Sequence, residues 1–135
     1  MDRANSLRRG QRALLAFCSI MNLMGAICFV PAFATGRRML GLPEAPPIYL
    51  AMLAAWVLIF GLGYLRLSLT GRMDRTFLWA AAAGKATFGV LIVSAAVSDD
   101  AINPWALGSG AMDFGLACVF AEWLFGKRET YQMEG

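Results

Sequence analysis

Residues 13–36 of this chain read ALLAFCSIMNLMGAICFVPAFATG and contain no charged side chain. A second uncharged stretch, APPIYLAMLAAWVLIFGLGYL, covers residues 45–65. The hydrocarbon core of a bilayer is about 30 Å thick and a helix rises about 1.5 Å per residue, so about 20 apolar residues cross it. Both stretches therefore predict transmembrane helices.

Two more apolar stretches follow, and each of them contains charged residues. Residues 76–98 include Lys85, and residues 105–125 include Asp113 and Glu122. Polar segments that contain glycine or proline separate the apolar stretches, which is typical of loops between helices. The sequence therefore predicts an all-α integral membrane protein. We expect a single domain, a four-helix bundle with spans at about 13–34, 47–69, 76–98 and 105–125.

The composition excludes several other classes of protein. Of the 135 residues, 59% are hydrophobic, 16% are charged and none is histidine. Soluble domains carry about 25% charged residues, so this chain has too little polar surface for an ordinary soluble enzyme. Its apolar content also excludes a disordered chain or a small disulfide-rich scaffold. Because histidine is the usual ligand of haem, zinc and copper, we predict no metal site, no cofactor and no catalytic set.

The distribution of basic residues predicts the orientation in the membrane. One side of the predicted spans carries Arg3, Arg8, Arg9, Arg12, Arg66, Arg72, Arg75, Lys127 and Arg128, whereas the other carries Arg37 and Arg38. Short loops rich in arginine and lysine stay in the cytoplasm. We therefore predict that both termini are cytoplasmic. The net charge of +3 then reflects topology, and we expect the lipid bilayer rather than a nucleic acid as partner.

The start of the chain also has features of a secretory signal sequence. A basic segment and an apolar run precede the small residues of Ala32-Phe33-Ala34. However, the apolar run is longer than the 7–15 residues that are typical of a signal core. We therefore predict that the first span is retained as a helix.

The polar residues inside the spans form the candidate site. Measured along the helices from their cytoplasmic ends, Asn22 and Lys85 lie about 13 Å deep and Asp113 about 18 Å deep. Because the third and fourth spans are consecutive and antiparallel, we predict a Lys85–Asp113 ion pair near the membrane centre, with Asn22 completing its hydrogen bonds. Tyr64 lies on a face of small and polar residues that we expect to point into the same interior. Such a pair either fixes the rotation of two spans or belongs to a ligand, proton or ion site.

Two other groups of residues are weaker candidates. Glu122 follows Asp113 by nine residues, or two and a half helical turns, so we expect it on the opposite face of the helix, near the interface and the basic tail. We retain it as a secondary candidate. The three cysteines form no Cys-x-x-Cys pair and are interpreted as small apolar residues.

Short motifs within the predicted spans also carry a resemblance. They are FGLGY at residues 60–64, Gly84-Lys85, Asp113, and Phe120 followed by Trp123-Leu124. Together with the basic N-terminus, they resemble small bacterial four-helix membrane proteins and are distantly similar to the DoxX-related group. The resemblance covers roughly residues 16–125. It implies a four-helix bundle in the inner membrane and no catalytic residue.

Three functions are compatible with this sequence. The first is a non-enzymatic accessory or assembly component of a membrane complex, as a homo-oligomer or with other subunits, because four short helices leave little room for chemistry. The second is a small transporter or ligand-binding protein whose site surrounds Asn22, Lys85 and Asp113. The third is a membrane enzyme acting on a lipid or quinone-like substrate. Its acid or base would have to be Asp113, Glu122 or Tyr64, which do not obviously converge.

Overall fold

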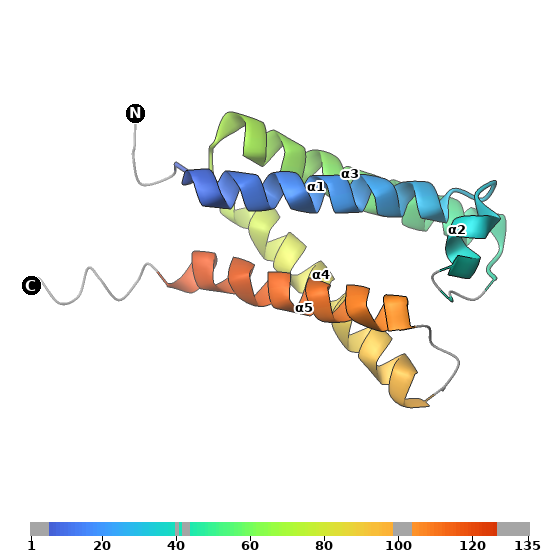
Figure 1. Cartoon of the computed structure of the whole chain (residues 1–135). Helices are drawn as coiled ribbons and strands as arrows, with labels where there is room; N and C mark the ends of the chain where they lie inside the picture. Colours follow the sequence, from blue (N-terminus) through green and yellow to red (C-terminus); the bar gives the residue numbers. More distant parts are fainter. Residues whose placement is uncertain (1–5, 40, 42–43, 99–103, 127–135) are drawn as a thin grey trace, which may run out of the picture. The chain divides into compact units, whose positions relative to one another are not determined.

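The computed structural model describes residues 6–39, 41, 44–98 and 104–126, and the secondary-structure elements in these ranges are all α-helices (Figure 1). This confirms the predicted all-α class. The helices are α1 (Arg9–Phe29), α2 (Ala34–Met39), α3 (Pro47–Thr70), α4 (Arg75–Ser98) and α5 (Pro104–Phe125). Three of them, α1, α3 and α4, are long and apolar enough to cross a membrane. This confirms the coarser prediction of membrane-spanning helices, whereas α5, with its two acidic residues, is not among the three.

Local sequence explains where the later helices begin and end. Both α3 and α5 begin at a proline, whose fixed φ suits the first helical turn and whose missing N–H is not needed there. At the end of α3, Gly71 adopts φ 64°, a left-handed conformation that glycine reaches without strain, and its N–H bonds to the carbonyl of Leu67. The bounds of α3, α4 and α5 therefore lie within a residue of the predicted ones.

The predicted bounds of the first helix were wrong at both ends. Helix α1 begins at Arg9, four residues earlier than expected, and ends at Phe29 instead of residue 34. Pro31 explains the early end, because a residue that precedes proline is driven out of the helical region and Val30 is extended at φ −57° and ψ 130°. After this turn the chain forms the short helix α2, which the sequence analysis did not predict.

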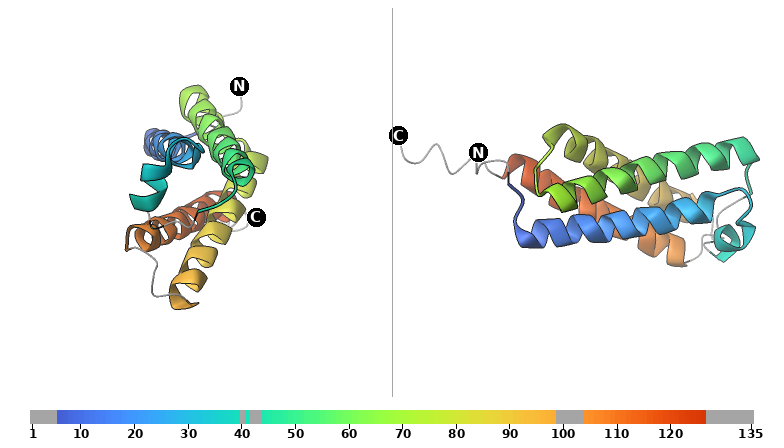
Figure 2. Two further views of the ribbon diagram at one scale, coloured as in Figure 1. Left: turned by 90° about the vertical axis from the view of Figure 1, so that its right-hand side faces the viewer. Right: turned by 90° about the horizontal axis from the view of Figure 1, so that it is seen from above.

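The chain divides into two compact units, the first ending at Asp74 and the second beginning at Arg75. In the first unit, α3 packs along α1, and α2 contacts the end of α1 (Figure 2). Small residues allow this close packing, since a Cβ added to Gly61 would lie 3.2 Å from the Cβ of Asn22. The second unit is the helical hairpin of α4 and α5.

Candidate functional site

The second unit brings together the two charged residues that the sequence analysis paired. Lys85 on α4 points its ammonium group at Asp113 on α5, and the Nζ–Oδ1 distance is 2.5 Å. The side chain of Lys85 is 8% exposed and that of Asp113 is 20% exposed. The predicted ion pair is therefore present, and it joins two helices that are 28 residues apart in sequence at this point.

Two glycines allow α4 and α5 to approach closely beside this pair. A Cβ added to Gly89 on α4 would lie 2.8 Å from the carbonyl oxygen of Gly110 and 2.9 Å from the Cβ of Phe114. Gly89 follows Lys85 by one turn, and Gly110 precedes Asp113 by about one turn, so the close approach adjoins the ion pair. The lysine stem therefore needs to span only a short distance between the helices.

The electrostatic role of the pair follows from its burial. Removing a charge from water costs several kcal/mol, and an opposite charge in contact offsets much of that cost. Lys85 is almost fully buried, so contact with the carboxylate of Asp113 offsets part of the cost of burying its ammonium group. Chemically, the pair can hold two helices in register, and it can also exchange a proton or open around a charged ligand.

The other two residues of the predicted site lie in the first unit. Asn22 on α1 donates a hydrogen bond from Nδ2 to the carbonyl of Val57 on α3, at 3.4 Å. Tyr64 on α3 is buried, with 1% of its surface exposed. Asn22 therefore contributes to the pairing of α1 with α3, and its expected participation in the Lys85–Asp113 pair stays a prediction.

Glu122 is exposed on α5, whereas Asp113 on the same helix is half-buried and paired. Their different surroundings agree with their positions on opposite faces of α5. The basic residues expected near Glu122, Lys127 and Arg128, lie outside the described residues.

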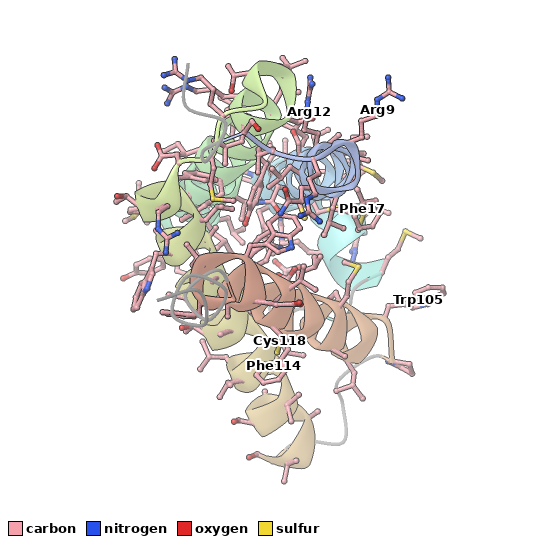
Figure 3. The ribbon with its side chains drawn as sticks, turned by 90° about the vertical axis from the view of Figure 1, so that its left-hand side faces the viewer. Arg9, Arg12, Phe17, Trp105, Phe114 and Cys118 are labelled. Carbon is pink, nitrogen blue, oxygen red and sulfur yellow. The ribbon has the colours of Figure 1, made fainter. Side chains whose placement is uncertain are left out.

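The sequence analysis missed the contribution of three arginines, which it used only to assign topology. In the structure their guanidinium groups donate to backbone carbonyls at or just beyond the ends of helices. Arg12 bonds to the carbonyls of Ser68 and Leu69 at 2.7 and 3.2 Å (Figure 3). Arg75 likewise bonds to the carbonyl of Leu124 at 2.5 Å.

The third arginine, Arg37 on α2, is buried near the end of α1. It donates to the carbonyls of Val30 and Pro31, at 3.0 and 3.4 Å. Its Nε is buried and has no hydrogen-bond partner in the described part of the chain. In the sequence, these hydrogen bonds are indicated only by the position of an arginine shortly after a helix that ends before a proline.

All three cysteines of the chain lie in the described ranges. Cys18 is buried, Cys28 is half-buried and Cys118 is exposed, and no disulfide joins them. Those ranges also contain no group of three or more cysteine, aspartate or glutamate side chains arranged to hold a metal ion.

Comparison with known proteins adds no relative from which a site could be transferred. No protein-family model matches the chain, and no curated protein or solved structure is significantly similar to it. The resemblance to the DoxX-related group therefore stays a prediction, and the contacts described above are the basis for a functional proposal.

Proposed function

We propose that this chain is a four-span protein of the bacterial inner membrane that acts as a non-enzymatic accessory or assembly component of a membrane complex. In this proposal α5 is the fourth span. The contact of Asp113 with Lys85 supports its insertion, because the pair offsets the charge that makes α5 less apolar than the other spans. The excess of arginine and lysine around the predicted inner loops supports cytoplasmic termini.

The observation that carries the proposal is the use of polar groups inside the helices to join neighbouring helices. Ser19 on α1 donates to the carbonyl of Gly61 on α3 at 2.8 Å, and Asn22 donates to Val57. Lys85 on α4 bonds to Asp113 on α5. Each of these side chains therefore stabilises a helix pair, as expected of a structural component.

The outward faces of the second unit favour contact with further helices. A Cβ added to Gly84, Gly108 or Gly115 would have no neighbouring heavy atom within 4 Å among the described residues. Large apolar residues are exposed as well, including Leu91 and Trp105 at 62% and 76%. Small residues on a transmembrane surface let another helix approach closely, so these faces suit a second copy or another subunit.

Chemical crosslinking in native membranes, followed by mass spectrometry, tests this proposal. We expect the 14.6 kDa chain to crosslink to itself or to another membrane protein, and we expect Gly115→Leu to reduce that product at least several-fold without lowering the melting temperature. Leu62→Phe adds bulk to an exposed face of large residues on α3 and is the matched control. A wild-type chain that remains monomeric and without partners would overturn the proposal.

A second candidate function is a small transporter or ligand-binding protein centred on Lys85 and Asp113. It is favoured by the 20% exposure of the Asp113 side chain, because an ionisable group in a membrane helix often marks a pathway for ions or protons. Liposomes that contain the purified protein, a pH-sensitive dye and an imposed pH gradient test it. A proton flux that Asp113→Asn abolishes, while circular dichroism shows that the variant is still folded, would support this function. A wild-type protein without flux would contradict a proton pathway.

A further inference from the structure

A groove of about 290 Å³ runs between α4 and α5 in the second unit. Its α4 wall is formed by Trp79, Ala82, Ala83 and Ala86. Its α5 wall is formed by Phe114, Ala117, Cys118, Ala121, Leu124 and Phe125, and Figure 3 labels Phe114 and Cys118 on this helix. None of these side chains is charged, so the groove suits a hydrocarbon.

The dimensions of the groove fit one extended hydrocarbon chain. Its α5 wall runs from Phe114 to Phe125, which is about 16 Å at 1.5 Å per residue, or about half of the hydrocarbon core of a bilayer.

A positive charge lies at one end of this groove. Arg75 precedes Trp79 by one turn, on the same face of α4, and it is exposed. Its guanidinium donates to the carbonyl of Leu124, a residue of the groove wall, and an arginine has five N–H donors in total. Arg75 is also the first residue of α4, where the positive end of the helix dipole lies.

We propose that this groove holds an acyl chain of an anionic phospholipid whose phosphate binds Arg75. The inference rests on the proposed membrane placement of α5, and Arg75 then lies at the cytoplasmic surface. The surrounding bilayer is as apolar as the groove, so the groove positions the chain and the headgroup supplies the preference. An arginine near the membrane surface favours an anionic lipid by about 1 kcal/mol, which corresponds to about five-fold in affinity.

Native mass spectrometry of the full chain tests this inference. The protein is delipidated in detergent and then titrated with phosphatidylglycerol or phosphatidylcholine that carry identical acyl chains. We expect one tightly retained lipid per chain, with phosphatidylglycerol retained about five-fold better. Arg75→Gln should bring the two lipids to equal retention, whereas Arg9→Gln, which removes an exposed arginine of the first unit, should leave the preference unchanged.

A second pair of variants tests the groove itself. Ala86→Leu fills the groove and should reduce retention of both lipids several-fold, while Ala80→Leu adds the same bulk to an exposed position of α4 outside it. The inference is overturned if the wild-type chain shows no preference, or if Arg75→Gln keeps it while the protein remains folded. Release of the chain from membranes by alkaline carbonate would instead contradict the proposed function. Formation of dimers with loss of the bound lipid would overturn the inference and indicate that a second copy of the chain occupies the groove.

Discussion

At the scale of single residues, the buried ion pair of Lys85 with Asp113 is expected to contribute to stability. Lys85 is 8% exposed and its ammonium group contacts the carboxylate of Asp113. Asp113→Asn removes the carboxylate that contacts this buried ammonium group, which we expect to lower the free energy of unfolding by about 3–5 kcal/mol. Unfolding of the purified protein in mixed micelles with increasing dodecyl sulfate, monitored by circular dichroism, measures this loss.

The double variant Lys85→Met with Asp113→Leu is the control, because it removes both charges and keeps apolar volume. Replacement of a whole buried pair is often neutral or stabilising, so we expect stability near that of the wild type. If Asp113→Asn alone is as stable as the wild type, the pair does not compensate a buried charge.

Arg37 is the second residue with a specific structural contribution. Its two hydrogen bonds cap carbonyls just after α1, and hydrogen bonds from charged groups contribute about 1.5–3 kcal/mol. We therefore expect Arg37→Gln to lower the melting temperature in detergent, with a loss of stability of about that size. Its neighbour Arg38 is exposed, so Arg38→Gln should leave the melting temperature unchanged. Equal effects of the two variants would show that the cap contributes nothing.

At the scale of elements, the α4–α5 hairpin depends on the close approach at Gly89. Gly89→Ala places a methyl group within 3 Å of the Gly110 carbonyl and of Phe114, and such overpacking costs about 1–3 kcal/mol. Gly84 lies on the same helix with open space around it, and Gly84→Ala should raise stability by about 0.5–1 kcal/mol through helix propensity. Thermal unfolding of the two variants, followed by circular dichroism, should therefore shift in opposite directions. Equal shifts would contradict the close approach.

At the scale of the whole molecule, the proposed topology has an even number of spans. Fusion of alkaline phosphatase after residue 102 should give an active enzyme, because that loop is expected outside the cytoplasm, where the enzyme folds. Fusion after residue 135 should give an inactive one, and a green fluorescent protein at the same position should fluoresce. An active phosphatase at the C-terminus would show that α5 does not cross the membrane.

The presence of the long helices and most of their ends could be predicted from the sequence, because both depend on residues close together in the chain. Apolar length, the prolines at the starts of α3 and α5, and the glycine after α3 specify three helices to within a residue. The predicted end of the first span was too late, because the apolar sequence continues past Pro31 whereas the helix ends at Phe29. Composition therefore predicted the presence of this helix and overestimated its reach.

The Lys85–Asp113 pair could be predicted because two consecutive antiparallel helices bring residues of similar depth together, and two opposite charges in an apolar setting need each other. Only the tertiary structure decided which carbonyls receive Arg12, Arg37 and Arg75, and that Asn22 bonds to Val57. These partners depend on helix rotation and on the distances between backbones far apart in sequence. A periodic pattern determines which face of a helix is polar, but the packing of one helix against another determines what that face meets.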